Sequence, residues 1–179
     1  MSDQKLAYNQ HYVCTEQEAL DLLSTRDRFW LAECGCRKDS CRRSGKEVCL
    51  WFINETHFPS REINHTEALA VHNYAAEKNL VYRPFRSQSD PKVIEGICHC
   101  CDCCCSYFRG EEPSDKGMYV EQTDHGSCSQ CGLCVPRCYF GARSMVAGKL
   151  QVDTEKCYGC GLCVKACLTG CISMVARRE

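Results

Sequence analysis

The chain has 179 residues and a formal net charge of −1, and 20 of its residues are cysteine. The near-neutral charge argues against a general nucleic-acid or anionic-membrane surface, and no run approaches the roughly 18 apolar residues of a membrane span. The first residues also lack the basic and then apolar pattern of a secretory signal. We therefore expect a cytoplasmic protein with reduced thiols, in which cysteine patterns indicate metal binding or catalysis rather than disulfides.

The beginning of the chain predicts a helix followed by a strand. A capping box opens the helix at residues 15–27, with Thr15 as the N-cap and Glu18 three residues later. The apolar segment 28–34 predicts a buried strand that leads directly to Cys34. The first cysteines after this strand are therefore expected at the end of an ordered element.

A second helix is predicted over residues 65–79, where it ends at Asn79, a residue type that tolerates the left-handed conformation. The segment 80–85 then predicts an extended strand, and 87–92 predicts a turn. Residues 108–117 predict an exposed connection to the C-terminal part of the chain.

Two groups of cysteines follow these predicted elements. The first group contains Cys34, Cys36, Cys41 and Cys49. The second group contains Cys98, Cys100, Cys101, Cys103, Cys104 and Cys105. Adjacent side chains point in different directions, so one metal centre cannot easily use every cysteine of the second group. His99 lies inside this group, and we expect it to be a pocket or surface residue rather than a ligand.

Basic residues are concentrated around the first group of cysteines. They are Arg37, Lys38, Arg42, Arg43 and Lys46. In a near-neutral chain such a patch is either a solvated loop or a functional surface. The functional interpretation is that the patch screens an anionic cluster or docks to an acidic partner.

The last third of the chain contains an internal duplication. The 20 residues from Cys128 share 12 identities with the 20 residues from Cys157, and each copy reads C-x2-C-x2-C-x3-C. Cysteines at intervals of three let a short loop present three thiolates to three irons of one cubane, so a fourth thiolate must come from elsewhere. Gly132 and Gly161 follow the second cysteine of each run, where a tight turn would offer backbone N–H groups to cluster sulfurs.

These runs resemble those of two-cluster bacterial ferredoxins, over roughly residues 118 to 178. The resemblance implies two [4Fe–4S] clusters, with the fourth cysteine of each run beginning a helix and binding the other cluster. One cluster would take Cys128, Cys131, Cys134 and Cys167. The other would take Cys157, Cys160, Cys163 and Cys138. A pair of zinc sites with four cysteines each is the alternative, although zinc motifs rarely repeat this spacing.

Further details of the runs refine the expectation. Tyr139 and Leu168 follow the fourth cysteines in place of the usual proline, which leaves the start of each helix open. Cys171 has no counterpart in the first run and is expected to be a buried small apolar residue. The segments 144–153 and 171–176 predict the strands of a small sheet that covers the clusters.

The two N-terminal groups of cysteines predict a third [4Fe–4S] cluster. Cys98, Cys101 and Cys104 repeat the interval of three seen in the runs, and one cysteine of residues 34–49 would complete the set. The remaining sulfurs would hold a structural zinc ion or line the cluster pocket. A zinc site without a third cluster, and free thiols, are the alternatives.

The expected fold class is α+β, with a ferredoxin-like two-cluster module at 118–179 and a small α/β cysteine-rich, metal-binding region at 1–110. The order of the cysteine groups runs from those after residue 33 through "CHCCDCCC" to the two C-terminal runs. This layout resembles that of the small subunit of the tungsten-dependent class of benzoyl-CoA reductase from strict anaerobes. That resemblance implies a subunit that relays low-potential electrons between a partner and a large catalytic subunit containing tungstopterin.

The sequence contains no recognisable motif for catalysis. It has no Gly-rich dinucleotide loop, no nucleophile elbow and no C-x3-C-x2-C run with an open iron site. We therefore expect an electron-transfer component rather than an enzyme by itself, partnered by a larger catalytic subunit and by a further electron-donor subunit or ferredoxin. The alternatives are a free soluble polyferredoxin and a zinc or Fe–S structural or sensor protein, although no nucleic-acid-binding motif is present.

Overall fold

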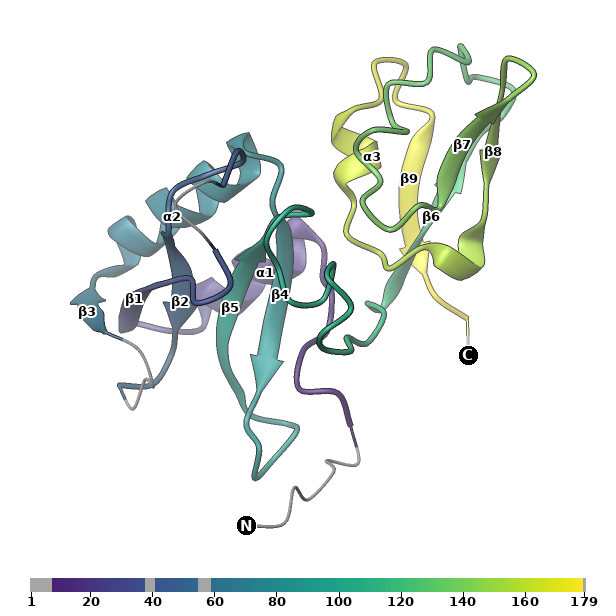
Figure 1. The fold of residues 1–179 in the computed structure, drawn as a ribbon. Coiled ribbons are helices and arrows are strands. Elements are labelled where there is room, and N and C mark those ends of the chain that lie inside the picture. The colour runs from purple at the N-terminus through teal and green to yellow at the C-terminus, as the bar shows by residue number, and fades with distance from the viewer. Residues whose placement is uncertain (1–7, 38–40, 55–58, 179) are drawn as a thin grey trace.

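The computed structural model describes residues 8–37, 41–54 and 59–178. Figure 1 shows an N-terminal part built on a five-stranded sheet, beside a smaller C-terminal part with two sheets of two strands each. Helices and sheets are thus mixed, as the α+β prediction requires. The predicted boundary between residues 110 and 118 falls in the segment that joins the two parts, and their independent folding stays a prediction.

The first helix and strand form where the sequence predicts them. α1 (Glu16–Ser24) begins after Thr15, whose hydroxyl accepts a hydrogen bond from the Glu18 N–H, while the Glu18 carboxylate accepts one from the Thr15 N–H. This reciprocal capping satisfies donors that a helix N-terminus otherwise leaves unpaired. β1 (Phe29–Glu33) ends directly before Cys34.

The N-terminal sheet has the strand order β3-β1-β2-β5-β4, and all neighbouring strands are antiparallel. Besides β1 it contains β2 (Glu47–Trp51), β3 (Ser60–Ile63), β4 (Val81–Arg86) and β5 (Ile94–Cys100). Only β1 and β4 are predicted from the sequence. β5 is the most consequential of the others, because it places the first cysteines of the second group on a central strand.

α2 (His65–Glu77) packs with α1 against one face of this sheet. It begins after a second capping box, formed by Asn64 and Glu67, and Asn79 has the expected positive φ of 54°. The core between helices and sheet contains Ala19, Leu23, Phe29, Leu31, Val48, Leu50, Ala68, Ala75, Tyr82 and Ile97.

Alternation along the strands gives the two faces of the sheet different chemistry, since successive side chains of a strand point to opposite faces. Val48, Leu50, Tyr82 and Ile97 face the helices. The alternate positions of the same strands line a cavity away from the helical core: Cys49, Trp51, Arg83, Phe85, Cys98 and Cys100. The sheet therefore presents sulfur and positive charge on the face opposite its apolar core.

The C-terminal part contains two separate sheets, whereas the sequence predicts one small sheet. β6 (Tyr119–Thr123) pairs with β9 (Ile172–Ala176), and β7 (Arg143–Val146) forms a hairpin with β8 (Lys149–Val152). A short 3-10 helix at Thr154–Lys156 follows the hairpin.

The helix predicted after each fourth cysteine does not form. The single-turn α3 (Leu162–Lys165) ends before Cys167, and among the described residues no helix begins at Cys138 or Cys167. Each of these cysteines instead accepts a backbone hydrogen bond from a glycine three residues later, at 3.1 Å for Gly141 and 3.3 Å for Gly170. Both glycines have positive φ, so the chain turns back before a helix can propagate.

A group of four aromatic residues joins the two parts of the molecule. This aromatic bridge consists of Tyr107, Phe108, Phe140 and Tyr158. The rings of Phe140 and Tyr158 are stacked with centroids 4.5 Å apart, and Tyr107 lies 5.4 Å from Tyr158. An ion pair between Glu16 and Lys165 also connects the parts.

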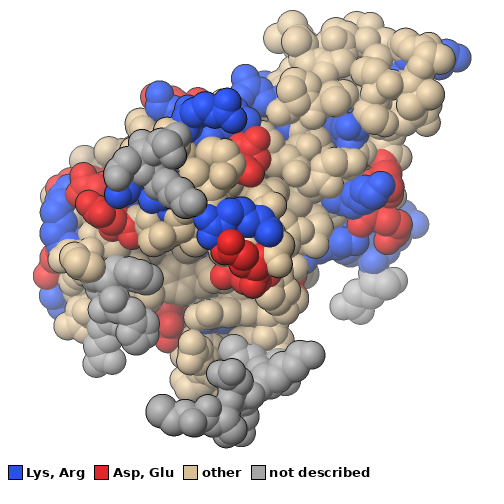
Figure 2. All heavy atoms as spheres, in the orientation of Figure 1, with Lys and Arg blue, Asp and Glu red and all other residues tan. Residues whose placement is uncertain are grey.

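Charge is distributed unevenly over the surface. In the view of Figure 2, charged side chains cover much of the N-terminal part, whereas the far end of the C-terminal part shows few of them. Exposed apolar residues of the C-terminal part include Leu133, Val146 and Leu168, the last being 83% exposed. In the described part of the chain, no helix combines the length and apolar character needed to cross a membrane.

Candidate metal centres

The structure sorts the cysteines of the two runs into two groups of four. Cys128, Cys131, Cys134 and Cys167, here called the distal group, line one hollow. Cys138, Cys157, Cys160 and Cys163, here called the proximal group, line another, together with Phe140 and Tyr158 of the aromatic bridge. In each hollow three cysteines come from one run and the fourth comes from the other run. This grouping agrees with the exchange of fourth cysteines that the ferredoxin resemblance implies, and the binding of a cluster by each group stays a prediction.

The loops around these hollows have the backbone geometry that the sequence predicts. Gly132 and Gly161 have φ values of 72° and 75°, in the left-handed region that favours glycine. The Ala142 N–H donates to the sulfur of Cys138 at 3.2 Å. Thiols that converge from two loops, with backbone donors beside them, suit a cluster that binds one thiolate at each of its four irons.

Arg143 is a buried cation that lies within reach of both groups. Its Nη1 donates to the Cys134 sulfur at 3.3 Å, and its Nη2 donates to the Glu121 carboxylate and to Thr123 Oγ1. Burial lowers the pKa of this guanidinium, but the negative charges of Cys163 and Glu121 outweigh burial, so the pKa is raised. Cys134 belongs to the distal group and Cys163 to the proximal group, so one positive charge acts on both.

Cys171 is buried, as predicted, and it also lines the distal hollow. Its sulfur lies 3.4 Å from that of Cys167. Hydrogen bonds from Thr169 and then Cys171 lower the pKa of Cys167 to about 7. The residue therefore supports the thiolate form of a predicted ligand rather than simply filling space.

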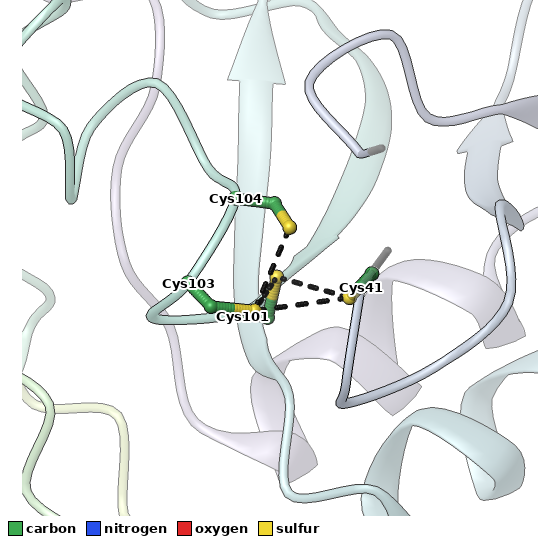
Figure 3. A group of neighbouring side chains, drawn as sticks. All are labelled: Cys41, Cys101, Cys103 and Cys104. Carbon is green, nitrogen blue, oxygen red and sulfur yellow. Dashed lines mark hydrogen bonds between the residues drawn. The ribbon is translucent and has the colours of Figure 1, made fainter. Parts of the chain in front are cut away.

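A compact group of four cysteines lies in the N-terminal part and is shown in Figure 3. Cys41 comes from the connection between β1 and β2, while Cys101, Cys103 and Cys104 come from the turn after β5. All four sulfurs lie within 4.8 Å of one another. The sequence predicts a third [4Fe–4S] cluster on Cys98, Cys101, Cys104 and one cysteine of residues 34–49. Cys101, Cys104 and Cys41 of that prediction do meet here, but Cys98 is not part of this group and Cys103 is.

The thiol of Cys41 is favoured in its charged form. Burial raises its pKa, but hydrogen bonds from the backbone N–H groups of Ser44 and Arg43 outweigh burial and bring the pKa down to about 6. A thiol with such a pKa is largely ionised at neutral pH, and the thiolate is the form that binds metals.

The other cysteines of the two N-terminal groups surround a cavity of about 380 Å³. They are Cys34, Cys36, Cys49, Cys98, Cys100 and Cys105. Cys101 and Cys104 also border this cavity, so the compact group adjoins it. The two N-terminal groups of the sequence thus combine into two sites in the structure, one compact and one open.

Arg83 places a buried positive charge at the cavity. The residue is 1% exposed, and its Nη1 donates to the Cys105 sulfur and to the Glu112 carboxylate, each at 3.0 Å. The same nitrogen lies 3.7 Å from the sulfur of Cys100. Burial lowers the pKa of Arg83, but the charges of Cys100 and Cys105 outweigh burial and raise it. A buried arginine between two sulfurs favours an anionic occupant of this cavity.

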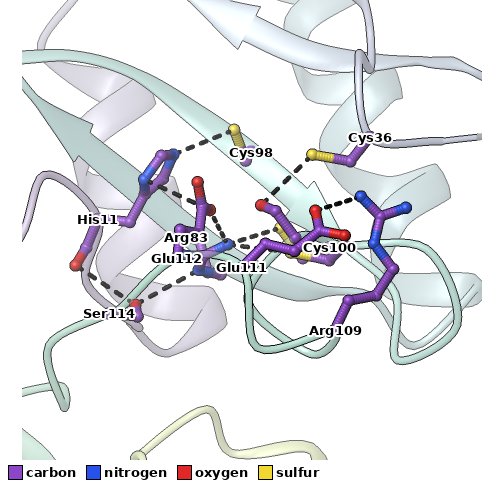
Figure 4. A network of polar contacts seen from close by, with 11 residues as sticks. His11, Cys36, Arg83, Cys98, Cys100, Arg109, Glu111, Glu112 and Ser114 are labelled. Atoms are coloured by element: carbon purple, nitrogen blue, oxygen red, sulfur yellow. Dashed lines mark hydrogen bonds and ion pairs between the residues drawn. The ribbon is translucent and has the colours of Figure 1, made fainter.

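Figure 4 shows how residues 112–114, which follow Tyr107 and Phe108 in the chain, hold Arg83 in place. Ser114 accepts a hydrogen bond from Arg83 Nε at 3.3 Å and is itself buried. Glu112 is half-buried and also lies 3.8 Å from Nδ1 of His11. The predicted exposed connection over residues 108–117 is therefore only partly correct. Residues 109–111, 113 and 116 are exposed, whereas Ser114 is buried and, with the half-buried Glu112, anchors a buried cation.

The basic patch near the first cysteines divides into different roles. Arg37 is buried and donates to the backbone oxygens of Gly45 and His99, at 2.9 Å and 3.0 Å, so the solvated-loop interpretation fails for it. Arg43 forms a two-pronged ion pair with Asp102, at 2.8 Å and 2.9 Å. Arg42 is exposed and Lys38 lies outside the described residues.

His99 lies in the core rather than in a metal site or on the surface. It is 1% exposed, and its Nδ1 contacts the backbone oxygen of Val48. Its ring packs 5.3 Å from that of Tyr82 on the helical face of the sheet. Alternation along β5 explains this position, because the cysteines on either side point to the opposite face.

Residues 127–171 match the family model of the 4Fe-4S dicluster domain. No curated protein matches the chain. The C-terminal part of this chain is therefore a ferredoxin-type Fe–S module, and a module of this kind points to a role in electron transfer.

The sequence reasoning missed the charged residues beside the sulfurs. Arg83 lies in the predicted strand 80–85, whose other positions are mostly apolar, and an arginine there is a signal for a buried counter-charge. Arg143 and Glu121 give no comparable signal, because they are separated by the whole first run. His11 and Glu112 meet only through folding, since they lie at opposite ends of the N-terminal part.

Proposed function

We propose that this chain is an iron–sulfur electron-transfer subunit of a larger oxidoreductase complex and has no catalytic activity of its own. The observation that carries this proposal is the series of three sulfur-lined sites formed by the cavity, the proximal group and the distal group. A [4Fe–4S] cluster bound at such sites supplies outer-sphere, one-electron transfer. The chain contributes the positions, the counter-charges and the shielding from water.

The third cluster of the proposal lies in the N-terminal cavity. Its six surrounding cysteines exceed the four that a cubane needs, and Arg83 supplies positive charge beside Cys100 and Cys105. This placement changes the ligand set expected from the sequence, because Cys101 and Cys104 belong to the compact group with Cys41.

The aromatic bridge connects the cavity to the proximal group. Cys105 and Cys160 belong to the same buried cluster as the bridge residues. Arg83 lies over the ring of Tyr107 at 5.2 Å, and Tyr158 lines the proximal hollow. Packed side chains therefore extend from one site to the next. The proximal group accordingly occupies the middle position in the proposed series.

The distal group supports a docking role at the end of the series. Cys131 is exposed, and the neighbouring Leu133 and Leu168 are 46% and 83% exposed. Exposed apolar side chains next to a redox site suit a partner that must approach closely to exchange electrons. We assign this end to one electron-transfer partner, and the cysteine-rich N-terminal part to the other.

The layout of the cysteine groups supports a specific partner class. Its resemblance to the small subunit of tungsten-dependent benzoyl-CoA reductase leads us to propose a large tungstopterin-containing subunit as partner, with low-potential electrons and a cytoplasmic location in an anaerobe. A further electron-donor subunit or ferredoxin would complete the chain of transfer.

Metal analysis of anaerobically purified protein tests the number of clusters. Three [4Fe–4S] clusters require about twelve irons per chain, whereas the ferredoxin module alone requires about eight. Replacing Cys98 and Cys100 together with serine should remove about four irons and leave the module's iron in place. A reproducible content of about eight irons in the unaltered protein would contradict the third cluster.

Isolation from the native cells tests the subunit role. Anaerobic gel filtration should show the chain in a stable complex with a larger protein that contains tungsten. A monomer that exchanges electrons with many unrelated acceptors would instead identify a free polyferredoxin.

A further inference from the structure

The compact group differs in scale from the sites assigned to clusters. In a cubane each thiolate extends outward from its own iron, so the ligand sulfurs stand apart. Around one tetrahedral ion, metal–sulfur bonds of about 2.3 Å hold the sulfurs about 3.8 Å from one another. In the compact group, Cys41 lies 3.8 Å from Cys101 and from Cys103, and Cys103 lies 3.5 Å from Cys101 and from Cys104. These separations fit one ion and are too short for a cubane.

The same contrast holds across the described part of the chain. There, neither the proximal nor the distal group has three sulfurs within 4.8 Å of one another, while the compact group has four. The spacing therefore distinguishes the compact group from the sites of the ferredoxin module.

We propose that Cys41, Cys101, Cys103 and Cys104 bind a single zinc ion that is separate from every iron–sulfur cluster of the chain. Four thiolates with no open position match structural zinc, which is tetrahedral and has no redox chemistry. Thiolate ligands favour zinc and iron–sulfur clusters, and sulfurs this close together fit the single tetrahedral ion.

The surroundings suit a structural ion. Cys101 and Cys104 are 1% and 7% exposed, whereas Cys103 is exposed. Arg43 pairs with Asp102 inside the same turn and so brings the two ligand-bearing loops together. The ion would fasten the connection after β1 to the turn after β5. These two segments also supply Cys36 and Cys105 to the neighbouring cavity, so the zinc would fix the shape of the third cluster site.

Zinc and iron analysis of the full-length, anaerobically purified protein tests the proposal. The unaltered chain should contain one zinc, and X-ray absorption at the zinc edge should show a single shell of four sulfurs at about 2.3 Å. Cys103→Ser should lose zinc and keep the iron and sulfide of the ferredoxin module. Cys103→His should keep zinc, because zinc accepts three cysteines and one histidine.

Cys131→Ser is the matched control, because Cys131 is also an exposed cysteine but belongs to the distal group. It should lower the iron content and leave zinc unchanged. The proposal would be overturned if the unaltered protein contained no zinc and Cys103→Ser lost iron. It would also be overturned if this site held a single iron ion or no metal at all. A content of one zinc with only eight irons would refute the third cluster and leave the zinc site standing.

Discussion

At the scale of single residues, buried arginines next to cysteine sulfurs are the recurring feature of this chain. Arg83 contacts Cys105 at the cavity, and Arg143 contacts Cys134 in the ferredoxin module. Arg37 is buried at the cavity and interacts with the charges of Cys34, Cys101 and Cys41. A buried charge is tolerated only where opposite charge compensates it. Glu112 pairs with Arg83 and Glu121 pairs with Arg143, and the sulfurs beside these arginines add to that compensation. Each arginine therefore also stabilises the anionic state of the neighbouring site.

Replacing Arg143 with methionine should make the reduction potentials of both module clusters more negative. An added electron is less favourable once the buried positive charge is removed. EPR-monitored redox titration measures the potentials, and Arg143→Lys should give a smaller shift. Breaking the pair also leaves Glu121 uncompensated, at a cost of about 3–5 kcal/mol. Glu121→Gln removes a negative charge and should shift the potentials in the opposite direction, so the double variant should lie between the two single variants. Unchanged potentials in Arg143→Met would refute the electrostatic role.

His72 should make stability depend on pH. It is fully buried, and burial lowers its pKa from the ordinary value of 6.5, although Glu16 opposes this effect. Below about pH 6.5 the unfolded chain therefore binds a proton at this residue more readily than the folded chain, so the free energy of unfolding falls as the pH falls. Above about pH 6.5 this residue no longer lowers the free energy of unfolding.

The variant His72→Phe keeps an aromatic ring against Tyr82, whose ring stacks on His72 at 4.8 Å. It should lose less stability than the unaltered protein between about pH 7 and about pH 5, as measured by anaerobic thermal unfolding. His125→Gln, at an exposed histidine, serves as the control and should follow the unaltered protein. Parallel pH curves for His72→Phe and the unaltered protein would contradict the assignment.

At the scale of elements, the two helices depend on their caps. Thr15→Ala should destabilise the protein by about 1 kcal/mol, because the first turn of α1 loses the side-chain acceptor for the Glu18 N–H. Urea unfolding under anaerobic conditions measures the change. Gln17→Ala alters an exposed residue of the same turn and should have a much smaller effect. Equal effects of both substitutions would show that the cap contributes nothing specific.

The elements also show what the sequence could predict and where it failed. α1 was predictable because a capping box is a local signal, and the exchange between runs was implied by their resemblance to ferredoxins. β5 was hidden because one set of its alternating positions contains Gly96, Cys98 and Cys100, which give no clear apolar or polar pattern. The helices expected at Cys138 and Cys167 fail because Gly141 and Gly170 turn the chain first. The pairing of Cys41 with the turn after β5 depends on the strand order, which no local pattern encodes.

At the scale of the whole molecule, the aromatic bridge determines the order of the sites. It lies between the N-terminal cavity and the proximal group, and it shares a buried cluster with Cys100, Cys105 and Cys160. Cys128, Cys134 and Cys167 of the distal group pack in a different cluster with Leu150 and Ile172. Among the described residues, that cluster shares none with the lining of the cavity. Electrons that pass between the cavity and the distal group would therefore have the proximal group on their route.

EPR spectroscopy of the fully reduced protein tests this order without a partner. Magnetic interaction between reduced clusters weakens steeply with distance, so neighbouring clusters broaden each other's signals. Cys131→Ser removes the distal cluster and should leave broadened signals, because the proximal cluster still adjoins the one in the cavity. Cys160→Ser removes the proximal cluster and should give two narrow, non-interacting signals from the remaining pair. A single narrow signal in Cys131→Ser would mean that the cavity holds no cluster, and strong broadening in Cys160→Ser would mean that the proximal group is not the middle site.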